Sequence, residues 1–169
     1  MLAALAAVSI QSCSPDRAKA YNNRTNVNTN GLEFIKGAHE GSLTEIEASK
    51  IAQKNSTNKE VTDFAAMMLT DHRAALSDID TLADHKYVYV RSVVNHDHKV
   101  ELDSLAKKTG AEFDKAYMEM MVKGHEEAKQ LFDEGKESNY TDIREVSVKI
   151  APTVEEHLKK AKEIAATLK

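Results

Sequence analysis

Four ionisable side chains lie at helical positions that the surrounding apolar pattern turns toward a core. Counting about 100° per residue, His72 lies about 10° from the centre of its apolar face, and His157 lies about 40° from the centre of its own. By the same count, Glu45 lies about 55° and His125 about 70° from the centres of their faces. All four lie near the middle of a predicted helix. We therefore expect them to converge inside a helical bundle.

Burial of these groups requires partners, because an unpaired buried imidazole or carboxylate is costly in free energy. Three imidazoles and one carboxylate form a ligand set that suits zinc, iron or copper. Met68 and Met121 each lie four residues before one of the histidines, a spacing that adds Cu(I) and a Met/His haem site to the alternatives. A purely structural alternative is that the histidines hydrogen-bond to a carboxylate or a tyrosine while the methionines only pack. The candidate metal ligands are Glu45, His72, His125 and His157.

The sequence has none of the common catalytic patterns. A di-iron centre of the Glu-x-x-His type needs a glutamate three residues before each histidine, and Leu69, Val122 and Val154 occupy those positions. No glycine-rich phosphate loop, Ser/His/Asp order or nucleophile elbow occurs. His96 and His98 lie on different faces of a short predicted helix, which favours a solvated segment. We therefore expect a binding protein rather than an enzyme.

Four long amphipathic helices and one short helix position these residues, because apolar side chains recur at i, i+3, i+4 and i+7. With approximate ends, the predicted ranges are Leu32–Lys54, Lys59–Asp84, Asn95–Lys108, Glu112–Glu134 and Thr141–Leu168. Pro152 should kink the last helix or split it near residues 149–151. The stretch from His85 to Val94 is β-branched and aromatic, and it predicts an extended crossover. Gly124, next to His125, should let a neighbouring helix approach the candidate site.

Two pairs of long helices with a long link between the pairs predict an all-α fold. The pattern favours a ferritin-like four-helix bundle with a long crossover that carries the short extra helix, rather than a simple up-and-down bundle. The composition agrees, because the 169 residues include only six glycines and two prolines, too few for a fold with many tight turns.

The charge balance argues against nucleic-acid binding. Lys and Arg number 23 and Asp and Glu number 27, so the formal net charge is −4. There is no basic excess to neutralise phosphates, and the acidic and basic residues are interleaved as on solvated helix faces.

The N-terminal segment predicts export and a lipid anchor. Residues 1–10 carry no charge and have the length of a signal-peptide apolar region, which is too short to span a bilayer. Cys13, the single cysteine, follows Ile10-Gln11-Ser12 in an order that resembles a bacterial lipobox, so we predict its lipidation; an unmodified thiol is the alternative. Residues 14–30 are polar and rich in asparagine, as in a flexible tether. The predicted organisation is a signal-peptide remnant (1–12), a tether (13–30) and a helical bundle (31–169).

Five stretches in order carry a family resemblance. They are Phe34-Ile35 with Ala38 and Gly41, Leu43-Thr44-Glu45-Ile46-Glu47, Val61-x-x-Phe64-Ala65-x-x-Met68 with Asp71-His72, Phe113-Asp114-x-x-Tyr117 with His125, and Pro152-Thr153-x-x-x-His157-Leu158. Together they resemble the bacterial domain-of-unknown-function 4142 family over residues 31–168. The resemblance implies a secreted, often lipid-anchored protein with a ferritin-like bundle, and the family's His and Glu positions coincide with the four candidate residues. It implies no established activity.

Two hypotheses about function follow. The first is a non-enzymatic binding or stress-related module of the bacterial cell envelope, anchored through Cys13 to a membrane and facing the periplasm, in either the inner or the outer membrane. The second is a metalloprotein that uses Glu45, His72, His125 and His157 to hold zinc, iron or copper for storage or redox chemistry.

Overall fold

The computed structural model describes residues 25–168, and within them the chain forms helices and no strands. The helices are α2 (Thr29–Asn55), α3 (Lys59–His85), α4 (His96–Ala106), α5 (Gly110–Lys136) and α6 (Thr141–Thr167). The prediction of an all-α fold is confirmed. Cys13, the predicted signal-peptide remnant and most of the predicted tether lie outside the described residues.

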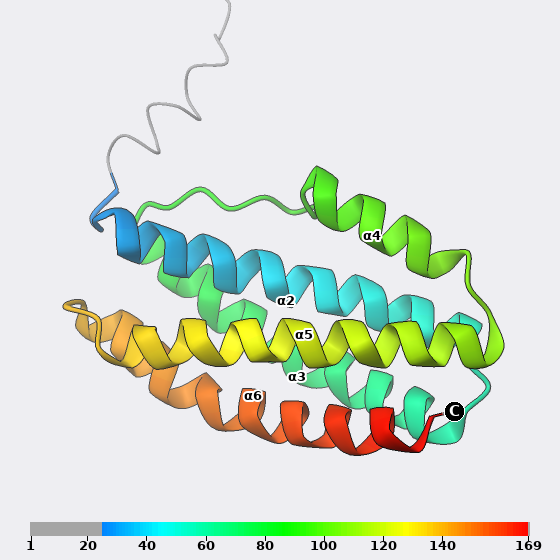
Figure 1. Ribbon diagram of the computed structural model, residues 1–169. Helices are drawn as coiled ribbons and strands as arrows, with labels where there is room; N and C mark the ends of the chain where they lie inside the picture. The colour runs from blue at the N-terminus through cyan, green and yellow to red at the C-terminus, as the bar shows by residue number, and fades with distance from the viewer. Residues whose placement is uncertain (1–24, 169) are drawn as a thin grey trace, which may run out of the picture.

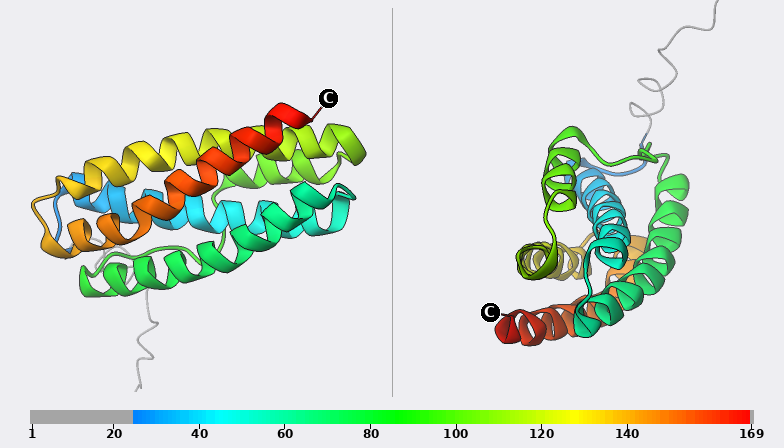
Figure 2. Two further views of the ribbon diagram at one scale, coloured as in Figure 1. Left: turned by 90° about the horizontal axis from the view of Figure 1, so that it is seen from below. Right: turned by 90° about the vertical axis from the view of Figure 1, so that its right-hand side faces the viewer.

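The four long helices pack side by side, as Figures 1 and 2 show. Helix α2 packs against α3 and α5, and α6 packs against α5 and α3. In Figure 1, α2 and α6 run in one direction and α3 and α5 run in the other. The link between α3 and α5 passes along the outside of the bundle, where α4 contacts α2 and α5. Each long helix therefore has two long neighbours that run opposite to it.

Asparagine side chains begin three of the helices, because each accepts a hydrogen bond from a backbone N–H that the first turn leaves free. Asn28 caps α2, Asn58 caps α3 and Asn95 caps α4. The Asn28 cap starts α2 at Thr29, so the helix begins two residues before the predicted domain boundary at residue 31.

The apolar core consists of two clusters. One contains Phe64, Met68, Tyr117 and Met121, and the other contains Ile79, Phe132, Ile150 and Val154. On every long helix, the ionisable candidate lies between residues of one cluster and residues of the other. The two clusters are therefore separated by a layer of polar side chains across the middle of the bundle.

The prediction that Pro152 splits the last helix is wrong, because α6 is continuous from Thr141 to Thr167. Pro152 is exposed, so water can reach the backbone carbonyl that loses its hydrogen bond to the missing proline N–H. Ala151 and Val154 beside it are buried and hold the helix on the core.

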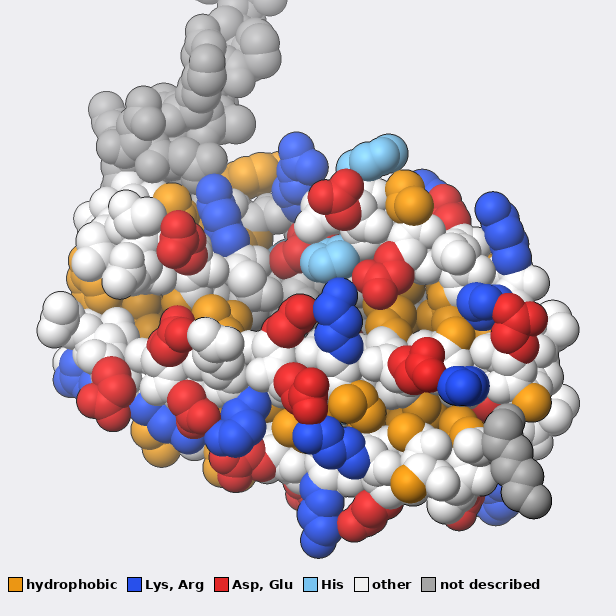
Figure 3. All heavy atoms as spheres, viewed as in Figure 1, with side chains coloured by type: hydrophobic (Ala, Val, Ile, Leu, Met, Phe, Trp, Pro, Cys, Tyr) orange, Lys and Arg blue, Asp and Glu red, His pale blue; other side chains and the backbone are white. Residues whose placement is uncertain are grey.

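The solvent faces of the helices carry charges of both signs. Figure 3 shows acidic and basic side chains side by side over apolar patches on the face that it views. Many of them pair along one helix, such as Lys59 with Asp63 and Lys99 with Asp103. Among the described residues, no helix is both long enough and apolar enough to cross a membrane.

Two glycines test how closely the helices pack. A Cβ on Gly135 would lie 2.5 Å from Cε2 of Phe34 and would also meet Oγ of Ser147, whereas a Cβ on Gly41 would meet no atom within 4 Å. We expect Gly41→Ala to raise the free energy of unfolding by up to about 1 kcal/mol, because alanine favours the helix. We expect Gly135→Ala to lower it by about 1–3 kcal/mol through overpacking. Urea unfolding of both variants checks the opposite signs, and two changes of the same sign would contradict the packing described here.

Candidate metal centre

The four helices bring the four predicted residues together in the polar layer. The ring centroids of His72 and His125 are 5.5 Å apart, and that of His157 lies 5.4 Å from each. One ring nitrogen from each histidine lies within 4.8 Å of one nitrogen of each of the other two. The three imidazoles therefore surround a common point, with all three side chains buried.

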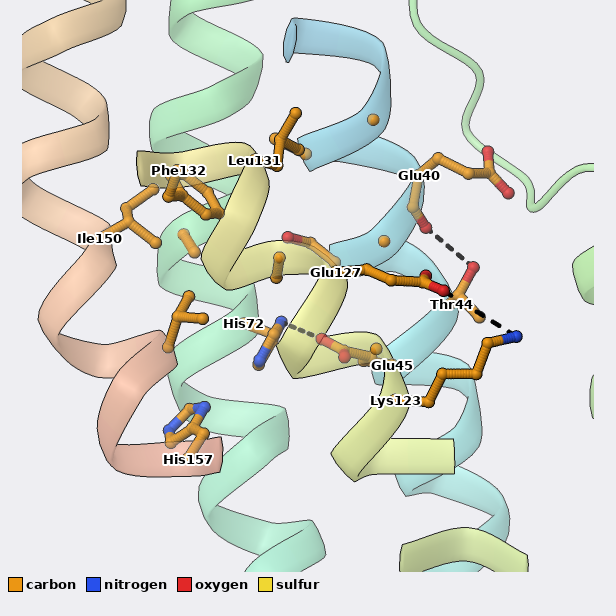
Figure 4. A pocket seen from close by; sticks show the side chains of 18 of the residues that line it. Glu40, Thr44, Glu45, His72, Lys123, Glu127, Leu131, Phe132, Ile150 and His157 are labelled. Carbon is orange, nitrogen blue, oxygen red and sulfur yellow. Dashed lines mark hydrogen bonds and ion pairs between the residues drawn. The ribbon is translucent and has the colours of Figure 1, made fainter. Parts of the chain in front are cut away.

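Glu45 lies against two of these rings. Its Oε1 is 3.1 Å from Nδ1 of His125, and its Oε2 is 3.2 Å from Nδ1 of His72. Figure 4 shows Glu45 and His72 pointing toward each other inside the bundle. The carboxylate thus contacts two of the imidazoles but does not lie among the three converging nitrogens.

His125 and His157 face each other, and each has one ring nitrogen hydrogen-bonded to an acceptor. Nδ1 of His125 lies 2.8 Å from the backbone carbonyl oxygen of Met121, and Nε2 of His157 lies 3.0 Å from Oδ2 of Asp71. Both partners can only accept, so both of these ring nitrogens carry hydrogen. The opposite nitrogens, Nε2 of His125 and Nδ1 of His157, lie 3.4 Å apart. When both rings are neutral, two lone pairs meet there, and a positive charge between them is needed to make the contact favourable.

His72 has a buried ring nitrogen without a hydrogen-bond partner in the described part of the chain. Its Nδ1 is buried and close to Glu45, but the contact lacks the alignment of a hydrogen bond and the atom has no other hydrogen-bond partner among the described residues. A buried nitrogen without a partner is destabilising. Because Glu45 lies on the Nδ1 side of this ring, the opposite ring nitrogen, Nε2, is the one that remains for an ion. The three histidines together therefore fit a metal ion.

The pKa values of these groups follow from burial and from Glu45. Burial lowers the pKa of His72 to about 4, against the charge of Glu45, and it also lowers the pKa of His157, against its hydrogen bond to Asp71. Burial opposes a charged His125 as well, but the charge and hydrogen bond of Glu45 outweigh it and raise the pKa of His125. Burial would raise the pKa of Glu45, and the charges of the neighbouring histidines, chiefly His125, lower it instead. A proton is thus most easily held on His125.

Gly124 makes room for the carboxylate. A Cβ at this position would lie 2.6 Å from Oε1 of Glu45. The predicted close approach next to His125 is therefore present, and the group that occupies the space is a side chain of α2.

A cavity of about 400 Å³ opens onto this layer, and Figure 4 shows part of its lining. Glu45, His72 and His157 line it, together with Asp71. His125 does not line it and is completely buried. The three-histidine cluster is therefore closed on the side of His125 and open on the cavity side.

Sequence reasoning missed several partners. Asp71 has a side chain that is 39% exposed, yet it accepts a hydrogen bond from Nε2 of His157. His39 is buried, and its Nε2 lies 3.2 Å from Oδ1 of Asp80. His98, expected in a solvated segment, is half-buried and lies 2.9 Å from Oε1 of Glu40. All of these contacts join different helices, and the periodicity of a single helix carries no signal for them.

Comparison with known proteins identifies the family. The family model "Domain of unknown function (DUF4142)" matches residues 16–164, so the chain belongs to this family. No curated protein matches.

Solved structures share the fold at low sequence identity. A DUF305 fragment from Deinococcus radiodurans has a TM-score of 0.73 and 9% identity, over 83% of this chain and 98% of that one. A putative secreted DUF305 protein from Streptomyces coelicolor has a TM-score of 0.69 and 12% identity, over 81% of this chain and 91% of that one. CopM in its Cu(II)-bound form has a TM-score of 0.67 and 16% identity, over 80% of this chain and 95% of that one. At these identities the likeness extends to the helical fold.

The shifted pKa of His72 predicts acid destabilisation of the metal-free protein. A histidine whose pKa is depressed in the folded state contributes stability above pH 6.5 and loses it as the pH falls toward the folded value of about 4. Its contribution to the loss should be about 3 kcal/mol at most. His157 acts in the same direction. The contribution of His125, whose pKa is raised, is already complete below pH 6.5 and does not offset the loss.

Urea unfolding in EDTA at several pH values between 7 and 4 measures this dependence. The variant His72→Gln should flatten it, whereas His96→Gln, on an exposed position, should keep the wild-type slope. Equal slopes for all three proteins would show that His72 is not buried in its neutral form.

Proposed function

We propose that this member of the DUF4142 family binds one divalent transition-metal ion at His72, His125 and His157. The observation that carries the proposal is the contact between Nε2 of His125 and Nδ1 of His157, each of which has its other nitrogen held by an acceptor. Hydrogen-bonded histidines with their remaining nitrogens turned toward one point are the usual arrangement around a protein-bound metal.

The spacing agrees with a bound ion. Two nitrogens at about 2.0–2.1 Å from a tetrahedral ion are about 3.3–3.4 Å apart. Nε2 of His125 and Nδ1 of His157 are separated by 3.4 Å. A ring nitrogen of His72 provides the third ligand, since it lies within reach of the other two.

Glu45 acts in this proposal through the rings that it contacts. Its oxygens lie beside Nδ1 of His72 and of His125, which leaves the far side of both rings for the ion. Glu45 and Asp71 together supply two negative charges, which balance a divalent cation in the buried layer. Glu45 is thus a charge partner that orients the histidines, rather than the direct ligand that its residue type and helical position predict.

Copper and zinc are the ions that three imidazoles favour by type, and iron is a weaker fit without a carboxylate among the ligands. A protein of similar fold, CopM, is described in a Cu(II)-bound form, which makes copper the first ion to test. The lack of a catalytic pattern supports binding or storage rather than turnover. The order and directions of the four long helices, with α4 in the crossover, support placing the bundle among the ferritin-like folds.

Metal titration tests the proposal directly. We expect the purified metal-free chain to bind one Cu(II) or Zn(II) ion, with an increase in thermal stability, because a ligand that binds only the folded state stabilises it. His72→Ala should weaken binding on the order of 100-fold. His96→Ala removes an exposed histidine and should leave affinity unchanged. Isothermal titration calorimetry measures the affinity, and elemental analysis measures the number of ions per chain. Wild-type protein with less than about 0.1 ion per chain would refute the site.

Two glutamate variants in the same titration distinguish an orienting role of Glu45 from a role as a direct ligand. Glu45→Gln keeps the shape but loses the charge, so an orienting role predicts a loss of about 10–100-fold in affinity with one ion still bound. Glu47→Gln, on the same helix and 41% exposed in its side chain, is the control and should have no effect. Loss of the ion at saturating metal would instead make Glu45 a ligand.

We also propose that the bundle is held at the bacterial cell envelope by lipidated Cys13 and faces the periplasm. Support comes from the uncharged segment 1–10 and the polar segment 14–30 in the sequence. A buried metal site presented beyond the inner membrane would serve binding of ions from the periplasm.

Fractionation of cells that express the full chain tests the anchor. The wild-type protein should require detergent for extraction and carry a lipid mass on Cys13, whereas Cys13→Ala should appear in the soluble periplasmic fraction. Extraction of the wild-type protein by salt alone, with an unmodified N-terminal mass, would contradict the anchor.

A further inference from the structure

The cavity beside the three histidines is much larger than a metal ion requires. Its volume of about 400 Å³ lies within the range of roughly 300–1,000 Å³ that is typical of pockets for small organic molecules. His72 and His157 line it directly, whereas His125 closes the opposite side. An ion at the histidines would therefore present one side to this space.

The inner part of the cavity is apolar. Leu131, Phe132 and Ile150 form its wall, and Ala75 and Ala128 line it with side chains too short to fill it. Figure 4 shows the three larger residues on one side of His72. An apolar surface of this kind favours a hydrocarbon or aromatic group over water.

The outer part of the cavity is acidic. Glu40, Glu101 and Glu127 line it, and the single lysine of the lining, Lys123, lies 4.0 Å from Glu127. Lys123 and Glu127 are exposed, so this part of the cavity reaches the surface. Carboxylates at the opening disfavour anionic molecules, because like charges repel in this partly desolvated space.

Three protein ligands leave a coordination position open on a zinc or copper ion. The cavity is where the open position faces, since the His125 side is closed. We infer that the cavity binds a small uncharged amphiphilic molecule, with a lone-pair nitrogen on the metal and an apolar body against Leu131, Phe132 and Ile150. This inference rests on the proposed metal site, and it adds a ligand class to it.

Small probes on the Cu(II)-loaded full chain test the inference. Imidazole has the donor nitrogen alone, 4-phenylimidazole adds an apolar ring, and benzoate has a similar ring with an anionic head. We expect 4-phenylimidazole to shift the copper absorption and to bind about tenfold or more tightly than imidazole, because its ring is buried in the cavity. Benzoate should bind more weakly than either.

Filling the cavity provides the decisive variant. Ala75→Leu and Ala128→Leu, made singly and together, should remove the preference for 4-phenylimidazole while imidazole still shifts the copper spectrum. Ala66→Leu adds the same side chain on the exposed face of α3 and should keep the preference. The single variants guard against misfolding of the double variant, which circular dichroism checks.

The two proposals fail separately in this experiment. A chain that takes up no Cu(II) contradicts the metal site itself. A chain that binds Cu(II) but shows no preference for 4-phenylimidazole, or keeps it when the cavity is filled, contradicts the cavity inference alone. Binding of 4-phenylimidazole to metal-free protein as tightly as to the copper form would also overturn it, because the metal would then have no part in recognition.

Discussion

The contact between His125 and His157 is the constraint on which the polar layer depends. Each ring has one nitrogen held by an acceptor that cannot donate, so the facing nitrogens can be brought to 3.4 Å only with a positive charge between them. In the metal-free protein a proton on His125 would supply that charge, and Glu45 favours it, since its charge and hydrogen bond raise the pKa of His125. A metal ion would replace the proton at the same place. In the proposed site, proton and metal would thus compete for one position.

The rest of the bundle holds this layer in place. Two apolar clusters, one on each side of the layer, bury the three histidines, and only the cavity side remains open. Gly124 gives Glu45 the space to reach His125, which a larger residue on α5 would take away. Each long helix contributes one member of the layer, so the geometry is fixed by helix packing rather than by a loop. Rigid supports of this kind are what a site of defined geometry needs.

The sequence was sufficient to predict the helical class, four long helices and the four residues of the polar layer. Periodicity succeeds there because a side chain's direction around its own helix depends only on its position in the chain. The split that it allowed at Pro152 is wrong, because whether a proline ends a helix depends on which face meets water. It also failed for Asp71 and for the carbonyl of Met121, which matter only once two helices meet. The role of Glu45 depends on distances between atoms of different helices, and a helical wheel gives no such distances.

A layer of this kind destabilises the metal-free fold and so links stability to occupancy. His72 has an unsatisfied buried nitrogen, and the pKa values of His72 and His157 are lowered, so the layer resists the charge that acid would add to it. A bound ion would take up the ring nitrogens that face one another, and its free energy of binding would add to the free energy of unfolding. A site meant only to stabilise the fold would gain from complete closure, as in structural zinc sites. This layer instead adjoins a cavity that reaches the surface at Glu127 and Lys123. The cavity removes packing contacts that would otherwise stabilise the fold. Such an opening is expected if ions or small molecules must reach the histidines and leave again.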